Sequence, residues 1–162
     1  MGWLARRLGV LLRVEGSPSR VALSFALGVF IAFFPILGIH TGLALAIAVL
    51  FRLNKVAILT GAWLNNPWTL APIYTTGTLV GCALLGVSPG SLAAVDWSLG
   101  GRAFYESLIA GFRPLLLPFV LGNLVAGTAA AALTFVLLRS VLTRRRQAAE
   151  RKAGESPAAP GR

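Results

Sequence analysis

The stretch VALSFALGVFIAFFPILGIHTGLALAIAVLF, residues 21–51, decides the fold because it carries no formal charge and has a proline in its middle. It is longer than the roughly 20 residues with which an α-helix crosses the hydrocarbon core of a bilayer. Proline lacks an amide hydrogen and its ring clashes with the preceding turn, so a helix must stop or kink at Pro35. We therefore expect two short helices that form a re-entrant hairpin, with residues 35–40 at its tip.

The rest of the chain repeats this apolar pattern. Two further uncharged runs, residues 56–86 and 115–138, are also long enough to cross a bilayer. Between residues 21 and 95 the only formally charged side chains are Arg52 and Lys55, and 56% of the chain is apolar. This composition predicts an all-α integral membrane protein, built of broken or re-entrant helical hairpins, transmembrane helices and an N-terminal interfacial amphipathic helix.

The net charge of +10 would suit a nucleic-acid partner, but the cations flank the apolar runs instead of forming a soluble basic domain. This distribution follows the positive-inside rule and excludes nucleic acid as the expected partner. Both termini are predicted to be cytoplasmic, with a re-entrant first run, a crossing by the second and a return by the third. The flanking cations are Arg6, Arg7, Arg13, Arg20, Arg52, Lys55, Arg139, Arg144, Arg145, Arg146, Arg151 and Lys152.

Local signals divide the chain into segments. Ser17 before Pro18 marks a helix start, because serine caps the first turn and proline fits there. The predicted membrane domain, 1–143, contains an interfacial helix 1–16, a broken or re-entrant helix pair 18–53, a second broken segment 55–86, an interfacial helix 102–113 and a transmembrane helix 115–138. A basic, disordered cytoplasmic tail is predicted for 144–162.

One helix face in the third run is made of small residues. Gly122, Ala126 and Ala130 recur every four residues, which suits close packing of helices. The alternative interpretation is an alanine-rich span without a special role. Cys82 lies inside an apolar run and predicts a small buried residue.

Two interrupted motifs, PxxGxHT at 35–41 and NNPxT at 65–69, lie in the stretch SPSRVALSFALGVFIAFFPILGIHTGLALAIAVLFRLNKVAILTGAWLNNPWTLAPIY. On these motifs the chain resembles the bacterial membrane-protein family catalogued as domain of unknown function 2062, clearly over 16–86 and loosely elsewhere. The family has no established activity, and the resemblance implies a bacterial inner-membrane location. Relatives joined to glycosyltransferase-like domains would imply a connection to lipid-linked sugar metabolism.

Irregular backbone inside a membrane is tolerated only where it packs in protein or faces a watery cavity. Two interruptions in one small chain therefore predict that they face each other around a polar pocket. The predicted breaks are Pro35, Gly38, Pro67 and Pro72. The candidate substrate-binding residues are His40, Thr41, Asn65, Asn66, Thr69 and Tyr74, with Arg20 and Arg52 at the cytoplasmic interface.

These residues favour a small transporter or scramblase-like protein for an amphipathic anionic substrate, such as a lipid phosphate headgroup. His40 would donate to the substrate or share its proton, since histidine has an unperturbed pKa near neutrality. The asparagines would bind the substrate without placing a fixed charge in hydrocarbon, and the two arginines would attract it from the cytoplasm. The expected partners are the lipid bilayer, its anionic headgroups and a second copy of the chain.

Purely structural interpretations stay open. His40 would then bond a carbonyl freed by Pro35, the asparagines would cap helix ends around Pro67, and Tyr74 would belong to an interfacial aromatic belt.

A second functional class is a non-transporting scaffold that recruits a partner enzyme, for example a glycosyltransferase. An intramembrane enzyme is not expected, because every acidic residue lies outside the apolar runs. We therefore expect no catalytic residues, no metal and no cofactor.

Overall fold

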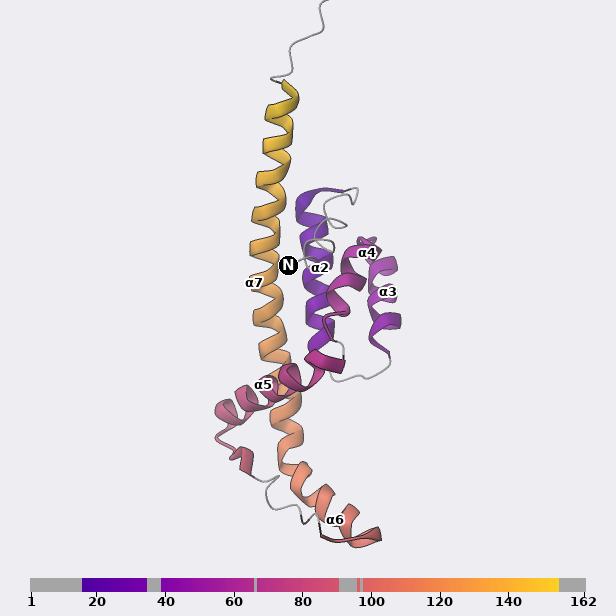
Figure 1. Cartoon of the computed structure of the whole chain (residues 1–162), viewed down its shortest axis with the longest axis vertical. Coiled ribbons are helices and arrows are strands. Elements are labelled where there is room, and N and C mark those ends of the chain that lie inside the picture. The colour runs from indigo at the N-terminus through magenta and orange to yellow at the C-terminus, as the bar shows by residue number, and fades with distance from the viewer. Residues whose placement is uncertain (1–15, 35–38, 66, 91–95, 97, 155–162) are drawn as a thin grey trace, which may run out of the picture.

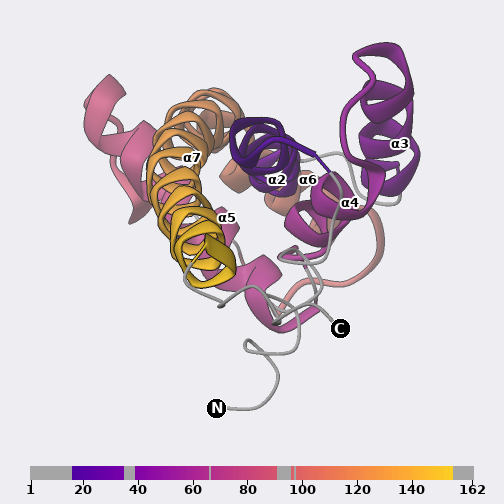
Figure 2. The ribbon, with the colours of Figure 1, turned by 90° about the horizontal axis from the view of Figure 1, so that it is seen from above.

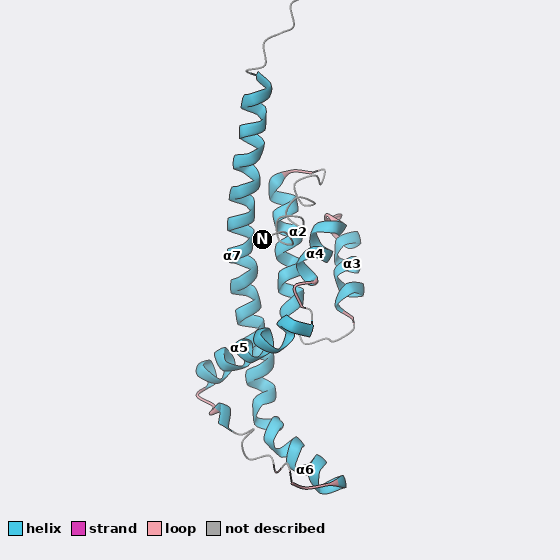
Figure 3. Ribbon diagram, in the orientation of Figure 1, coloured by secondary structure: helices cyan, strands magenta, loops and turns pink. Residues whose placement is uncertain are grey.

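The computed structural model describes residues 16–34, 39–65, 67–90, 96 and 98–154. All regular structure in these ranges is helical (Figure 3), which confirms the predicted all-α class. The predicted interfacial helix at 1–16 lies almost wholly outside them. The elements are α2 (Pro18–Phe33), α3 (His40–Leu50), α4 (Lys55–Ala62), α5 (Pro67–Leu85), α6 (Gly101–Phe112), η2 (Arg113–Leu115) and α7 (Leu116–Gly154).

Helix α2 begins where the sequence predicted. The backbone N–H of Arg20 donates to Ser17 Oγ at 3.4 Å, so the serine caps the helix. Pro18 occupies the first turn, where the backbone N–H groups have no partner within the helix, so the missing amide hydrogen of proline costs no hydrogen bond.

The first interruption is also confirmed. α2 ends at Phe33, and Phe34 is extended, with φ −78° and ψ 127°. The chain is helical again from His40. Pro35 and Gly38, the residues predicted to cause this interruption, lie outside the described residues.

The second interruption separates α4 from α5. α4 ends at Ala62 and α5 begins at Pro67, as expected of a residue that fits the first helical turn. Pro72 lies inside α5 and does not end the helix, so the prediction of a break at Pro72 is wrong. A proline inside a helix removes one i−4 hydrogen bond and crowds the i−4 carbonyl, which can kink a helix without ending it.

α2, α3 and α4 lie side by side as three short helices (Figure 1). α2 and α4 make the closest contact, because they cross where each has a glycine, Gly28 and Gly61. α3 lies on the outer side, farthest from α7 (Figure 2). It packs through small side chains, Ala44 and Ala48, which are buried together with Ile58 of α4.

A buried hydroxyl connects α2 to the start of α4. Ser24 is fully buried, and its Oγ donates to the carbonyl of Arg20 at 2.7 Å and accepts from the backbone N–H of Asn54 at 2.9 Å. The side chain of Asn54 caps α4 by accepting from the N–H of Ala57 at 2.9 Å. Ser24 therefore holds the residue that starts α4.

Replacing Ser24 with alanine is expected to lower the free energy of unfolding by about 1–3 kcal/mol, because the partly buried N–H of Asn54 loses its acceptor. Denaturation in detergent micelles would measure the change. Ser140→Ala is the matched control, since the Ser140 hydroxyl is exposed and donates to the i−4 carbonyl of its own helix. Equal losses in the two variants would contradict this role of Ser24.

α7 is the longest helix and packs against both α5 and α2 (Figure 1). The predicted small-residue face is used within the chain at Gly122, which lies directly against Gly77 and Gly81 of α5. Gly127, which the sequence analysis did not include in this face, receives Phe33 of α2.

The predicted disordered tail is corrected over its first part, because α7 continues as a helix to Gly154. The prediction rested on low apolarity, but Arg, Gln, Glu and Ala are all strong helix formers. Arg146 Nε also donates to Glu150 at 3.0 Å, an i, i+4 pair that stabilises the helix modestly at the surface. Residues 155–162 lie outside the described part of the chain.

One cluster of buried apolar side chains joins the starts of α2 and α4 to α7. Val21 and Ala57, near the starts of α2 and α4, are buried together with Leu138 and Leu142 of α7. The cations that adjoin these residues in sequence, including Arg20 and Arg139, therefore lie at one end of the short helices.

α6 lies at the other end of the molecule (Figure 1). On its exposed surface Arg102 Nε donates to Glu106 at 2.8 Å. Nearby, the hydroxyl and the backbone N–H of Ser98 donate to Asp96 and hold the pKa of this carboxyl below its usual value.

Candidate functional site

The two interruptions of the chain are joined by side-chain hydrogen bonds. Asn65 Nδ2 lies 2.9 Å from His40 Nε2 and donates to Tyr74 Oη at 3.2 Å. Tyr74 Oη in turn donates to the carbonyl oxygen of Phe34 at 3.3 Å. These four residues, which we call the break cluster, connect both sides of the first interruption to both sides of the second.

The hydrogen-bond pattern fits one proton arrangement of the break cluster. The Asn65 amide nitrogen has two hydrogens, and its two neighbours are His40 Nε2 and Tyr74 Oη. When this nitrogen donates to both, Nε2 is an acceptor and the imidazole proton lies on Nδ1. Neutral His40 thus fits the cluster as a hydrogen-bond acceptor.

One polar atom of the cluster is left over. Asn65 Oδ1 is inaccessible to solvent and has no hydrogen-bond partner among the residues that the structure describes. A buried acceptor without a partner costs about 1–3 kcal/mol, so it persists only where something else favours it. It is the feature of the cluster most easily explained by a ligand or by a second arrangement of the same groups.

The other pocket residues predicted from the sequence have different positions. The Thr69 hydroxyl donates to the carbonyl of Leu64, in the segment between α4 and α5. Thr41 is exposed in the first turn of α3, next to His40. Asn66 lies outside the described residues.

The two predicted arginines are together, but away from the break cluster. Arg20 Nη2 donates to the carbonyl oxygen of Arg52 at 3.3 Å, and Arg52 has a left-handed backbone with φ 50°. Arg20 is in the first turn of α2, whereas Phe34 directly follows the last turn. The two residues are therefore about 21 Å apart along the helix axis, at a rise of 1.5 Å per residue. The predicted site is therefore two sites: the break cluster and a basic end.

Two members of the site were missed by the sequence analysis. The carbonyl of Phe34 is the acceptor of Tyr74, and its position directly before a proline was the available signal. Phe119 of α7 packs edge-to-face on Tyr74, with ring centroids 5.4 Å apart. No local signal pointed to Phe119, because this contact depends on how α5 crosses α7.

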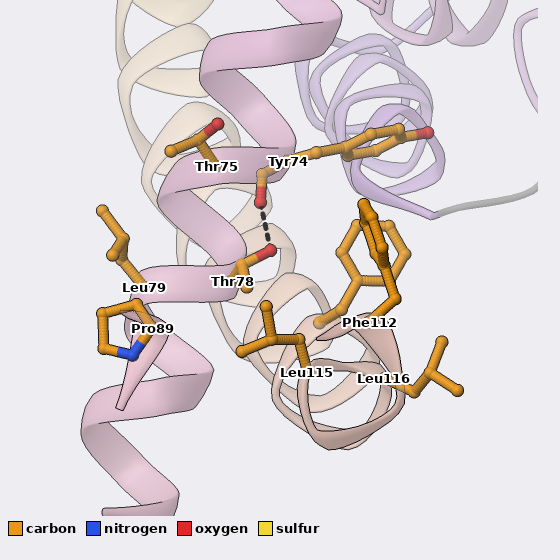
Figure 4. A pocket seen from close by; sticks show the side chains of 9 residues that line it. Tyr74, Thr75, Thr78, Leu79, Pro89, Phe112, Leu115 and Leu116 are labelled. Carbon is orange, nitrogen blue, oxygen red and sulfur yellow. Dashed lines mark hydrogen bonds between the residues drawn. The ribbon is translucent and has the colours of Figure 1, made fainter. Parts of the chain in front are cut away.

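A groove of about 340 Å³ adjoins Tyr74 between α5 and the start of α7. Its walls are mostly apolar side chains, as Figure 4 shows for Leu79, Leu115 and Leu116. The Thr78 hydroxyl in this groove donates to the carbonyl of Tyr74 at 2.6 Å, drawn as a dashed line in Figure 4.

Titratable residues are sparse near the site. Within the described residues no three His, Cys, Asp or Glu side chains are close enough to hold a metal ion. Cys82, the single cysteine of the sequence, is buried and forms no disulfide.

Fold and site together define a small all-helical protein whose two interrupted segments are bonded to each other. Within the described residues, two helical stretches are long and apolar enough to cross a membrane, one at Trp68–Leu85 and one inside Gly101–Arg151. The chain belongs to the family described as "Uncharacterized protein conserved in bacteria (DUF2062)", which matches residues 2–151 and confirms the resemblance seen in the sequence. Neither curated proteins nor solved structures show a match to the chain.

Proposed function

We propose that this protein is a multi-pass protein of the bacterial inner membrane in which α2 and α3 form a re-entrant hairpin. The grouping of Arg20 and Arg139 at one end supports this orientation, because cations favour the cytoplasmic side. Phe33 packs on Gly127, which is close to the middle of the uncharged run 115–138. The short helices would therefore enter from the cytoplasm and turn near the middle of the bilayer.

In this orientation α4 and α5 together make one crossing and α7 makes the return, so that both termini are cytoplasmic. Figure 1 shows α5 crossing α7 where the short helices end. The break cluster would then lie at membrane depth, where polar groups are costly unless they are paired or have a role.

The function that this geometry supports best is a small transporter or scramblase-like protein for an amphipathic anionic substrate, such as a lipid phosphate headgroup. The single observation that carries the proposal is the bonded set of His40, Asn65 and Tyr74 between two interrupted helices, with one buried amide oxygen unused. Interrupted helices near the membrane midplane are where many transporters bind their substrates.

The cluster has a second arrangement that would suit an anion. If His40 carries a proton on Nε2, the Asn65 amide must rotate so that Oδ1 accepts from it. The amide N–H groups then replace the unused oxygen and become available to donate to a phosphate oxygen.

The test is lipid translocation in liposomes that contain the purified protein, followed with a fluorescent phosphatidylglycerol and an impermeant quencher. His40→Ala, Asn65→Leu and Tyr74→Phe are each expected to slow translocation about tenfold or more, because about 1.4 kcal/mol of lost stabilisation corresponds to a factor of ten in rate. Tyr74→Phe is the most specific variant, since it keeps the ring contact with Phe119 and removes only the hydroxyl.

Thr128→Ala is the matched control, because its exposed hydroxyl donates only within α7, to Leu124. It should translocate lipid at the parent rate. Parent-like rates for all three cluster variants would refute the proposed site.

The scaffold alternative would recruit its partner enzyme through helical faces and the basic tail. Gly122 of the small-residue face is packed against Gly77 and Gly81 of α5, so this residue is not available to a partner enzyme. One of the surfaces that a scaffold could use is therefore occupied within the chain.

A further inference from the structure

An apolar groove of about 780 Å³ runs along α2 and α3. Its walls include Leu23, Leu27 and Phe30 of α2 and Leu43 and Ile47 of α3. Leu23 is 42% exposed, so the wall is incompletely covered by the described part of the chain. The groove follows α2 along its length, because its lining runs from Arg20 to Phe34.

The two ends of the groove differ chemically. At one end Arg20 lies beside Phe51 and near the carbonyl of Arg52. At the other end is Phe34, whose carbonyl belongs to the break cluster. The groove therefore connects the basic end to the break cluster over about 21 Å.

We propose that this groove binds one hydrocarbon chain of an anionic phospholipid, with the lipid phosphate at Arg20. The proposal rests on the membrane function proposed above and adds the site that holds the lipid before its headgroup reaches the break cluster. A cation at the mouth of an otherwise apolar groove matches an amphiphile with a negative head and an apolar tail. Arginine is well suited to the head, because its planar guanidinium can form two bonds to a phosphate.

Charge complementarity distinguishes the lipid from other occupants. The segment before α2 carries Arg6, Arg7 and Arg13 with Glu15 as its single acid, so it would bring like charge to the basic end. A second copy of the chain is also basic, with 15 Lys and Arg against 5 Asp and Glu. An anionic lipid alone among these three brings opposite charge.

The test is native mass spectrometry of the full chain in detergent, titrated with phosphatidylglycerol or with phosphatidylcholine of the same chains. The parent is expected to retain phosphatidylglycerol preferentially. Leu27→Trp fills the groove and should weaken retention of both lipids about tenfold, whereas Arg20→Gln should remove most of the preference for phosphatidylglycerol.

Two controls match these variants. Leu45→Trp places the same side chain on α3 at a residue that does not line the groove, and Arg151→Gln removes an exposed charge far along α7. Both should bind lipid as the parent does. Equal effects of Leu27→Trp and Leu45→Trp, or an unchanged lipid preference in Arg20→Gln, would overturn the proposal.

The other occupants give different results. If residues 1–13 fill the groove, their deletion would raise lipid retention, and if a second copy fills it, Leu27→Trp would dissociate an oligomer that Leu45→Trp leaves intact. Either result would also overturn the proposal. His40→Ala separates the two proposals. Normal lipid retention with lost translocation supports both. If all three cluster variants translocate lipid at the parent rate, the break cluster is refuted, and the Leu27 and Arg20 variants still decide whether the groove binds lipid.

Discussion

Replacing Gly61 with alanine is expected to lower the free energy of unfolding by about 3 kcal/mol, at the upper end of the usual range for an overpacked contact. A Cβ atom at this position would lie 2.3 Å from the carbonyl oxygen of Phe25 and 3.0 Å from Gly28 Cα. These are backbone atoms of α2, which cannot move aside by changing a rotamer. The two helices would have to separate along their whole contact.

Gly28→Ala should have the same effect, since its Cβ would lie 2.1 Å from the carbonyl oxygen of Ile58. Gly42→Ala in α3 is the matched control, because nothing lies within 4 Å of an added Cβ there. Alanine has the higher helix propensity, so this control should be neutral or stabilising by up to about 1 kcal/mol. Denaturation in micelles measures all three variants, and similar stability for Gly61→Ala and Gly42→Ala would contradict the close crossing of α2 and α4.

A comparable loss of stability, about 3 kcal/mol, is expected for Gly81→Ala at the contact of α5 with α7. The added Cβ would lie 1.8 Å from the carbonyl oxygen of Pro118, again a backbone atom. Gly77→Ala, one turn earlier in α5, differs in a useful way. Its Cβ would lie 2.3 Å from Oδ1 of Asn123, which is a side-chain atom that a second substitution can remove.

The decisive measurement is therefore a double-mutant cycle. Asn123→Ala should rescue Gly77→Ala, with a coupling energy of about 1–3 kcal/mol, and should not rescue Gly81→Ala. Asn123 is buried and its Oδ1 has no partner among the described residues, so its removal relieves one unsatisfied acceptor while losing the bond to the carbonyl of Phe119. Additive losses at Gly77 and Asn123 would show that α5 and α7 do not meet in this register.

Much of the helical layout was predictable because its causes are local. Ser17 and Pro18 fix the start of α2 through capping and a preset backbone angle, and α5 likewise begins at a proline, Pro67. The same local reasoning failed at Pro72, because a proline inside a helix can kink it without ending it. It also failed in the tail after residue 143, where helix propensity outweighed low apolarity.

The candidate site was predictable only in part. Sequence reasoning placed His40, Asn65 and Tyr74 in one pocket because irregular backbone in a membrane needs polar partners. It also joined Arg20 and Arg52 to this pocket, whereas the structure places them at the far end of α2. The sequence analysis grouped these residues by their polarity alone, and did not take into account the length of α2 that separates them.

By itself, the sequence determined that this chain is helical, apolar and interrupted twice, because helix propensity, proline geometry and the spacing of charges act over a few neighbouring residues. Only the tertiary structure decided which surfaces meet. Gly28 on Gly61 and Gly81 on Pro118 bring backbones together, and Asn65 reaches His40 across the gap between separate helices. Such contacts depend on how helices distant in sequence pack together. The shape of their surfaces, and the absence of a Cβ atom at each glycine, determine how closely two backbones approach.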